Sequence, residues 1–330
     1  MRHDAGPMAV VCCDSLRHNR RTLANLVANF VDMLPPAEAR QLAPRMAEHV
    51  RFPSSVVDRI VPAATAEDRA EVRRMIGLDD QGTVVAEPFR LWVLEDDFPG
   101  GRPKWEAAGA LLTADTSLYE LIKLRMLNGA HSTLAYLSAL AGCETIADTV
   151  AHDAFRAVAQ QLLRVDVRPT VTAPAGLDLP AYERQLLERF ANPALRHRTV
   201  QIAMDGSQKL PHRLLPTLRA RRAAGAEPRW AALAVAAWMR WVWAERTDVG
   251  APRVLDDPLA PALQQAVAGS DSAADAVARL LAVSAVFGDD LSDDPECVRL
   301  LTDALQRLTA DGALAAARAL VAGATEEGTA

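Results

Sequence analysis

The sequence has few of the features that mark metal-bound, secreted or nucleic-acid-binding proteins. Its 330 residues include four cysteines, with no CxxC pair and no zinc-finger spacing to histidine, so we expect neither disulfides nor a metal. A formal net charge of −6 excludes a general nucleic-acid binder, because phosphate neutralisation needs a basic face. The apolar stretch from Trp230 to Ala244 is interrupted by Arg240, and no signal peptide opens the chain. These absences predict a cytoplasmic protein without membrane or nucleic-acid partners.

The spacing of the glycines argues against one further kind of site, the glycine-rich turn that binds a dinucleotide. No two of the 17 glycines are separated by a single residue, so the chain contains no Gly-x-Gly core of a dinucleotide-binding turn. The front of the chain also shows too few strand patterns for a doubly wound sheet. Aromatic residues make up 5% of the chain, whereas half of all residues are hydrophobic, which favours a helix-rich globular fold.

The apolar spacing predicts a mainly α protein, with a small α/β segment over 1–102 and a multi-helical domain over 103–330. Strands are expected at Met8–Cys13 and Val84–Leu94, and a strand or ordered loop at Phe52–Pro62. Helices are expected at Thr22–Leu34, at Ala37–Glu48 and after a capping box at Thr65–Asp68. From Pro103 onward the expected helices are Ser117–Ala141, Cys143–Leu163, Pro180–Phe190, Thr199–Met204, Gln208–Ala224, Trp230–Arg246, Pro258–Val267, Ser272–Phe287, Asp294–Thr309 and Gly312–Val321.

One helix carries three residues able to do chemistry together. Lys123 and His131 are eight residues apart, so on a regular helix they project within about 80° of each other. Asn128 is three residues before His131 and lies further round. A lysine, an amide and an imidazole can therefore meet on one pocket wall. On pattern alone, however, these residues are more typical of ordinary polar groups on an amphipathic helix.

Several segments resemble one family in the order in which they occur. FPSSVVDRIVP at Phe52–Pro62 carries a Val-Asp-Arg core, and it is followed by EPFRLWVLEDDFPGGRPKWE at Glu87–Glu106. LIKLRMLNGAHSTLAYL then spans Leu121–Leu137, and RFANPALRHRTVQIAMDGSQKLPHRLL spans Arg189–Leu215. CCDSLRHNRRTL at Cys12–Leu23 is a looser match. These segments resemble the mannitol dehydrogenase family of polyol-specific long-chain dehydrogenases.

The resemblance implies that a Rossmann-type cofactor domain should precede the Cys12–Leu23 segment. We therefore expect this front half to be missing, with residues 1–102 a remnant of the cofactor domain plus the signature segment, and 103–330 the helical substrate and catalytic domain. The chain departs from the family pattern at Ser15, where asparagine is usual. It departs again at Arg20, where glycine is usual, and this change would shift the loop that presents Asn19.

The family's chemistry is a metal-free hydride transfer between a secondary alcohol or ketone and NAD or NADP. The resemblance assigns Lys123 as the acid/base, which requires a pKa depressed from its usual value of about 10.4. It assigns Asn19 and Asn128 as amide donors to the substrate oxygen. His131 would orient the substrate, and Glu120 would relay the proton to solvent or form an ordinary surface ion pair.

The remaining positions concern substrate recognition. By resemblance, Asp58 anchors the pocket floor, and Lys209 and Arg198 contact distal substrate oxygens, where a carboxylate would suit them. The AMDGSQKLP segment looks most like fructuronate (mannonate) reductases, so the expected substrate is a sugar acid of the D-fructuronate/D-mannonate type. Two alternatives stay open: a mannitol- or arabinitol-type polyol dehydrogenase, and an inactive truncated fragment without cofactor binding. The choice between NAD and NADP also stays open.

Overall fold

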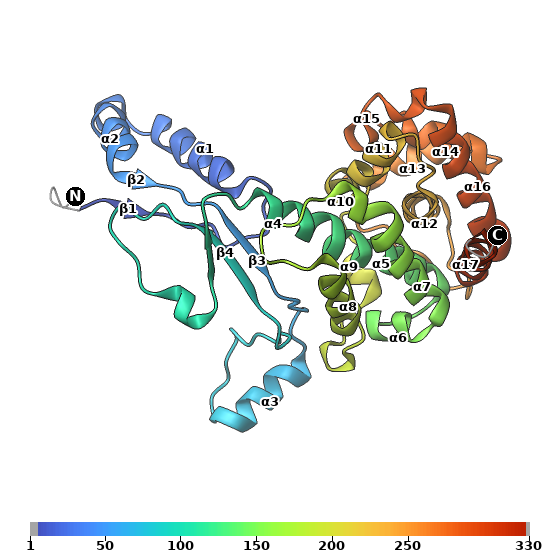
Figure 1. Cartoon of the computed structure of the whole chain (residues 1–330), viewed down its shortest axis with the longest axis horizontal. Helices are drawn as coiled ribbons and strands as arrows, with labels where there is room; N and C mark the ends of the chain where they lie inside the picture. The colour runs from blue at the N-terminus through green and yellow to red at the C-terminus, as the bar shows by residue number, and fades with distance from the viewer. Residues whose placement is uncertain (1–5, 328–330) are drawn as a thin grey trace. The chain divides into compact units, whose positions relative to one another are not determined.

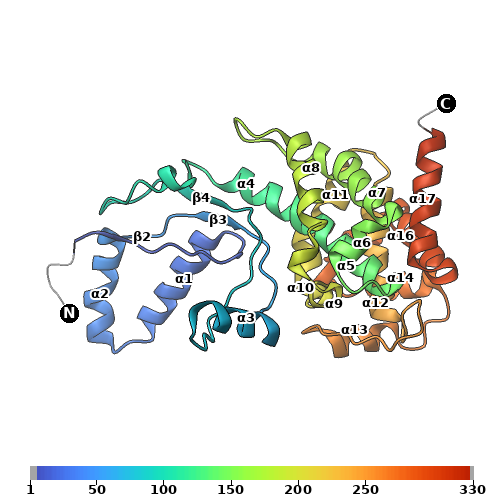
Figure 2. The same cartoon turned by 90° about the horizontal axis from the view of Figure 1, so that it is seen from below.

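The computed structural model describes residues 6–327 and divides them into two compact units. Unit 1 covers residues 6–61 and 86–121, and unit 2 covers residues 62–85 and 122–327. The chain is helix-rich with small sheets (Figures 1 and 2).

Unit 1 begins with a parallel crossover. Strand β1 (Met8–Ala9) pairs in parallel with β2 (Val50–Arg51), in the register Met8 to Val50. Two helices, α1 (Asn19–Asp32) and α2 (Pro36–His49), connect these strands (Figure 1). Parallel strands need such a crossover because a tight hairpin can join only antiparallel ones. The predicted strand Met8–Cys13 is shorter in the structure, where β1 covers two residues, Met8–Ala9. Both helices predicted for this segment are confirmed.

A second sheet carries the signature segment. Strand β3 (Ser55–Asp58) pairs antiparallel with β4 (Leu91–Glu95), and β4 pairs in parallel with β5 (Leu111–Thr113), in the order β3-β4-β5. Figure 1 shows β3 and β4 running side by side. Between β4 and β5 lies the 3₁₀ turn η1 (Trp105–Ala108). The short strand β5 lies inside the region 103–330 that was expected to form a helical domain, before the first helix expected there.

The predicted strand at Val84–Leu94 is wrong in its first half. Residues before Leu91 form no ladder, because Glu87 is bound to the segment after β3 instead. The Glu87 amide donates to Ile60 O at 3.2 Å, and the Glu87 carboxylate accepts from Ile60 N at 2.6 Å. Pro88, which has no amide hydrogen to donate, also disfavours a ladder here.

The capping box in unit 2 is confirmed. Helix α3 (Ala66–Ile76) begins after Thr65, whose hydroxyl accepts from the Asp68 amide at 3.2 Å. The Asp68 carboxylate in turn accepts from the Thr65 amide at 2.8 Å, which satisfies two backbone donors at once. The helix ends at Gly77, where φ is +73°, a conformation that glycine adopts without strain.

The rest of unit 2 is a helical bundle around two central helices. Helices α5 (Gly129–Ala141) and α12 (Arg229–Trp243) are buried along almost their whole length, as expected for helices that are apolar on all sides. Figure 1 shows the other helices enclosing α12. In the part of the chain that the structure describes, no helix combines the length and apolar character needed to cross a membrane.

The remaining elements of unit 2, with α4 at its border, follow in chain order. They are α4 (Ser117–Ile122), the π-turn η2 (Lys123–Asn128), α6 (Ile146–Ala151), α7 (Asp153–Gln161), the π-turn η3 (Leu162–Val167), η4 (Arg168–Thr170), α8 (Leu179–Phe190), η5 (Pro193–Leu195), α9 (Thr199–Ala203), α10 (Gly206–Arg213), α11 (Leu215–Ala223), α13 (Ala260–Val267), α14 (Ala273–Leu281), α15 (Ser284–Phe287), η6 (Leu291–Asp293), α16 (Pro295–Asp311) and α17 (Ala313–Glu327).

Helix α10 requires glycine at its first residue, Gly206, because a side chain there would clash with buried neighbours. A Cβ added at Gly206 would lie 2.0 Å from Trp238 Nε1 and 2.9 Å from the Tyr136 hydroxyl. Both side chains are fully buried and have no room to move away. We expect Gly206→Ala to lower the free energy of unfolding by about 1–3 kcal/mol, measured by denaturant titration. Gly323→Ala is the control, because the added Cβ meets no atom within 4 Å and because φ at Gly323, as at Gly206, lies outside the left-handed region. Equal losses for both variants would contradict the packing explanation.

Candidate active site

The helix with Lys123 is interrupted by a π-turn that spans Lys123–Asn128. The Gly129 amide donates to Leu124 O, five residues back, instead of four. On a regular α-helix Lys123 and Asn128 would project about 140° apart. In a π-turn a residue lies roughly above the one five positions earlier, so Asn128 shares a side with Lys123. The expectation that Asn128 lies further round a regular helix is therefore corrected.

The two side chains differ in their surroundings. Lys123 is buried, with a relative exposure of 9%. Asn128 is half-buried, and among the described residues its amide makes no side-chain hydrogen bond. The Asn128 amide can therefore offer its N–H groups to a ligand at the side of the helix that Lys123 occupies.

A close helix approach brings α10 to this turn. A Cβ at Gly129 would lie 3.1 Å from Arg213 O, so the absence of a side chain at this position lets the end of α10 pack against the turn. Arg213 Nη1 donates to Ser132 Oγ at 3.1 Å, which ties α10 to α5 a second time. Arg213 and Lys209 are four residues apart on α10 and share its face.

His131 lies in an aromatic and cationic environment. Its ring stacks on Phe190 at 5.1 Å between centroids and meets the His197 ring edge-on at 4.9 Å. Burial holds the pKa of His131 well below its usual value, and the neighbouring His197, Arg213, Lys209 and Arg189 lower it further. His131 is therefore a neutral imidazole, and its buried Nε2 has no hydrogen-bond partner among the described residues.

Lys209 is held by backbone carbonyls rather than by carboxylates. Its Nζ donates to Ile202 O at 3.1 Å and to Met204 O at 2.5 Å, while Asp205 is 4.0 Å away. Burial, and next the charge of Arg213, lower the pKa of Lys209 to about 8. Burial also lowers the pKa of Arg213, which forms no ion pair within the described residues. The charges of Lys209, Arg213 and Arg189 thus act on His131, while Asp205, Asp256 and Asp257 act on Lys209.

Arg198 is not part of this group. It is exposed and lines a separate hollow of about 500 Å³ in unit 2, together with Thr65, Asp68 and Val254. The arginines whose charges reach His131 are Arg189 and Arg213, which the sequence reasoning missed. The spacing of four between Lys209 and Arg213 was an available signal for the second of them.

Within unit 1, Asn19 is buried and fully engaged. Its Nδ2 donates to Ser55 O at 2.7 Å and makes longer contacts of 3.3 Å with Cys12 O and Ser55 Oγ. Its Oδ1 accepts from the Ser55 amide at 3.2 Å. In this arrangement Asn19 ties α1 to the start of β3. A donation to a substrate oxygen would have to replace one of the 3.3 Å contacts.

The residue next to Asn19 behaves differently from the expectation. Arg20 lies within α1 with helical backbone, so the change from glycine does not strain a turn here. The left-handed residue is His18, with φ +50°. Arg20 instead pairs with Glu95 and lies 3.8 Å from Asp97.

Asp58 and Glu120 are the other two predicted site residues in unit 1. Asp58 is buried at the end of β3. Glu120 accepts from the His18 amide at 2.9 Å and lies 3.8 Å from the His18 ring. It lines a hollow of about 290 Å³ in unit 1, beside Arg20 and Asp115, which gives its carboxylate access to solvent.

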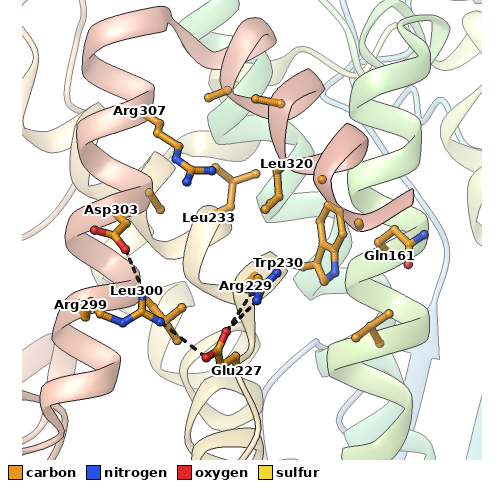
Figure 3. A pocket seen from close by; sticks show the side chains of 16 residues that line it. Gln161, Glu227, Arg229, Trp230, Leu233, Arg299, Leu300, Asp303, Arg307 and Leu320 are labelled. Carbon is orange, nitrogen blue, oxygen red and sulfur yellow. Dashed lines mark hydrogen bonds and ion pairs between the residues drawn. The ribbon is translucent and has the colours of Figure 1, made fainter. Parts of the chain in front are cut away.

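A larger hollow of unit 2, about 780 Å³, contains none of the predicted site residues (Figure 3). Trp230, Leu233 and Leu320 form its apolar wall. Its charged groups largely pair with one another: Arg299 lies 2.9 Å from Asp303 and 3.7 Å from Glu227, which also binds Arg229 at 3.0 Å. Among the described residues, no cluster of three or more His, Cys, Asp or Glu side chains could hold a metal ion.

Two family profiles match this chain. The profile of the mannitol dehydrogenase C-terminal domain matches residues 115–309, more than half of the chain. The chain belongs to the mannitol dehydrogenase family. The profile of the mannitol dehydrogenase Rossmann domain matches residues 1–107.

The second match overturns a prediction. The expectation that the Rossmann domain is missing, with only a remnant over 1–102, is wrong, and the truncated-fragment alternative loses its basis. The glycine test failed because a Gly-x-Gly motif marks one phosphate-binding turn, whereas a domain is recognised over its whole sequence. The β1–α1–α2–β2 crossover is a parallel unit of the kind from which Rossmann domains are built.

Several family relatives are similar over nearly the whole chain. D-mannonate oxidoreductase from Escherichia coli is 44% identical over 95% of this chain and 64% of its own length. Mannitol 2-dehydrogenase from Pyrenophora tritici-repentis is 35% identical over 95% of this chain and 55% of its own. The structure of Pseudomonas fluorescens mannitol 2-dehydrogenase with NAD and D-mannitol matches with a TM-score of 0.83 at 33% identity, over 95% of this chain and 62% of that one. The chain thus spans less than two thirds of each of these relatives.

Proposed function

We propose that this chain carries the acid/base and substrate-binding groups of an oxidoreductase that interconverts a secondary alcohol and a ketone with NAD or NADP. We further propose that its substrate is a sugar acid of the D-mannonate/D-fructuronate type. The observation that carries the substrate assignment is the cationic group around His131, which consists of buried Arg189 and half-buried Lys209 and Arg213. The free state of all four cysteines supports the predicted cytoplasmic location.

A nicotinamide cofactor fits residues 1–107. The parallel β1–β2 crossover through two helices supplies the type of unit on which Rossmann domains bind nucleotides. When bound, the cofactor supplies or accepts the hydride. The P. fluorescens relative was solved with NAD, which supports the same cofactor class here.

Three residues of unit 2 then act on the substrate, each with a different role. Lys123 donates the proton to the oxygen during ketone reduction and removes it during alcohol oxidation. Asn128, beside Lys123 on the π-turn, donates its amide N–H to the same oxygen as negative charge develops there. His131, a neutral imidazole with a free Nε2, fixes a neighbouring hydroxyl.

The residues of unit 1 have supporting roles in this proposal. The family resemblance assigns Glu120 as a proton relay, and Glu120 lines a hollow of unit 1 that is open to solvent. It assigns Asn19 as a second amide donor, a role in which Asn19 would give up one of its 3.3 Å contacts. It assigns Asp58, at the end of β3, as an anchoring residue.

The balance of charge favours a sugar acid over a polyol. A cation withdrawn from water is costly unless an anion is close, and here half-buried Lys209 lies 4.0 Å from Asp205, while half-buried Arg213 forms no ion pair among the described residues. A substrate carboxylate would supply the missing negative charge. A neutral polyol would leave these cations without it. The greater identity to a D-mannonate oxidoreductase than to a mannitol 2-dehydrogenase agrees with this choice.

The test is a comparison of substrates. We expect kcat/KM for D-mannonate oxidation to exceed that for D-mannitol and D-arabinitol by about 10-fold or more, since a hydrogen bond to a charged group is worth about 1.5–3 kcal/mol. Lys209→Met should shrink this preference, whereas Arg198→Met, at an exposed position outside the cationic group, should leave it unchanged. A preference for D-mannitol would favour the polyol alternative instead.

A further inference from the structure

Two neighbouring imidazoles in unit 2 each bury a ring nitrogen without a hydrogen-bond partner. These atoms are His131 Nε2 and His197 Nδ1, and the two rings lie 4.9 Å apart. Buried polar atoms without a partner are few in folded proteins, because each forfeits the hydrogen bonds that it makes in water. The described residues contain ten such atoms, and these two lie on adjacent rings, where a single ligand could serve both. His131 is already a predicted substrate residue, and His197 is not.

The backbone around His197 is fixed firmly enough to place its ring. His197 O accepts from the Ile146 amide at 3.0 Å, and the Thr199 amide donates to Glu144 O at 3.0 Å. Directly before it, Arg196 has φ +45°, a left-handed conformation that non-glycine residues rarely adopt. Strain of this kind is often found at functional sites, where it serves to aim a side chain.

The charges around His197 indicate what the missing partner is. Burial, and next the charge of Lys209, lower the pKa of His197 to about 4, so its ring is neutral at physiological pH. Both imidazoles therefore present hydrogen-bonding nitrogens without adding charge of their own. The nearby cations Lys209 and Arg213 supply the attraction for an anion.

We propose that His197 is a substrate-binding residue, which hydrogen-bonds the carboxylate end of the sugar acid beside Lys209 and Arg213. This inference rests on the proposed function and extends it to a residue that the family resemblance did not point to. Lys123 and Asn128 would hold the reacting oxygen, His131 a hydroxyl between, and His197 the end of the substrate that carries the charge.

The experiment measures D-mannonate binding by calorimetry, and KM and kcat with NAD⁺, for the protein and two variants. We expect His197→Phe to weaken D-mannonate binding and raise KM about 10-fold or more, with kcat changed far less. His197→Asn keeps a polar atom close to the position of Nδ1 and should retain most of the affinity. His152→Phe is the matched control, because His152 is exposed and its ring contacts only Phe155 among the described aromatic rings. D-mannitol binding should change less than D-mannonate binding in His197→Phe.

The possible failures are distinguishable. If the unmodified protein binds no sugar acid, the proposed substrate falls and the role of His197 falls with it. If the unmodified protein binds D-mannonate and His197→Phe binds it as tightly, only the role of His197 is overturned. A uniform loss, in which both variants lose D-mannonate and D-mannitol alike and melt at lower temperature, would assign His197 a structural role and also overturn the proposal.

Discussion

Replacing Lys123 by alanine is expected to lower kcat for alcohol oxidation by about 10²–10⁴-fold, the usual contribution of a general acid or base. The substrate oxygen would lose the group that exchanges its proton, and this exchange is needed only in the transition state. The loss should therefore fall on kcat rather than on KM. Steady-state kinetics with D-mannonate and NAD⁺ measure both constants.

Further variants separate the chemistry at Lys123 from the effect of its charge. Lys123→Arg keeps the positive charge but cannot give up its proton near neutral pH, so it should be nearly as inactive as the alanine variant. Small primary amines added to Lys123→Ala should restore part of the activity, because they can occupy the cavity left by the side chain. Lys104→Ala, which removes an exposed lysine, is the matched control. Full activity in Lys123→Ala would show that the family resemblance misassigns the acid/base.

The sequence predicted the helical element that carries Lys123 better than the local geometry of that element. The apolar spacing correctly predicted a helical run over Ser117–Ala141 and so placed Lys123, Asn128 and His131 on one element. It did not predict the π-turn, because apolar periodicity is judged over several turns and does not resolve a single turn that holds one extra residue. The spacing of Lys123, Asn128 and His131 in the family is compatible with a π-turn, but the spacing alone does not reveal one.

For a related reason, the sequence analysis predicted only one member of the cationic group, Lys209. Lys209 and Arg213 share a helix face by spacing, but only the packing of α10 against Gly129 turns that face toward His131. Arg189 and His197 come from α8 and the loop after η5, so their approach depends on tertiary contacts that no local pattern encodes. Arg198 was predicted because it lies near Lys209 in the sequence, and Arg189 was not among the predicted site residues.

The predicted strand at Val84–Leu94 is wrong in its first half because side-chain contacts override the local preference for β-structure. The segment before β4 is rich in β-forming residues, yet Glu87 binds Ile60 with its carboxylate and its amide, outside any ladder. The capping box at Thr65, by contrast, was fully predictable, because all its atoms lie within four residues. Local signals were reliable when their partners were local.

Asn128→Ala is the second change from which we expect a large effect, a loss of roughly 3 kcal/mol of transition-state stabilisation, or about 10²-fold in kcat. The half-buried Asn128 amide has no side-chain hydrogen bond to lose among the described residues, so the variant should melt close to the unmodified protein. A large loss of rate with little loss of stability is what a donor to the reacting oxygen predicts. Asn128→Asp should be damaged at least as much, because it replaces the N–H donor by a negative charge beside the developing one.

The π-turn adds a stricter test of the same idea. Because it places Asn128 and Lys123 on one side of the helix, both should act on one oxygen, and their effects should not add. The double variant Lys123→Ala/Asn128→Ala should therefore lose less than the product of the two single losses. Gln161→Ala removes a comparable amide from the hollow in Figure 3 and should leave kcat unchanged. If Asn128→Ala keeps kcat within about 3-fold, or if the two losses multiply fully, Asn128 and Lys123 do not share the substrate oxygen, and the π-turn only shapes the packing against α10.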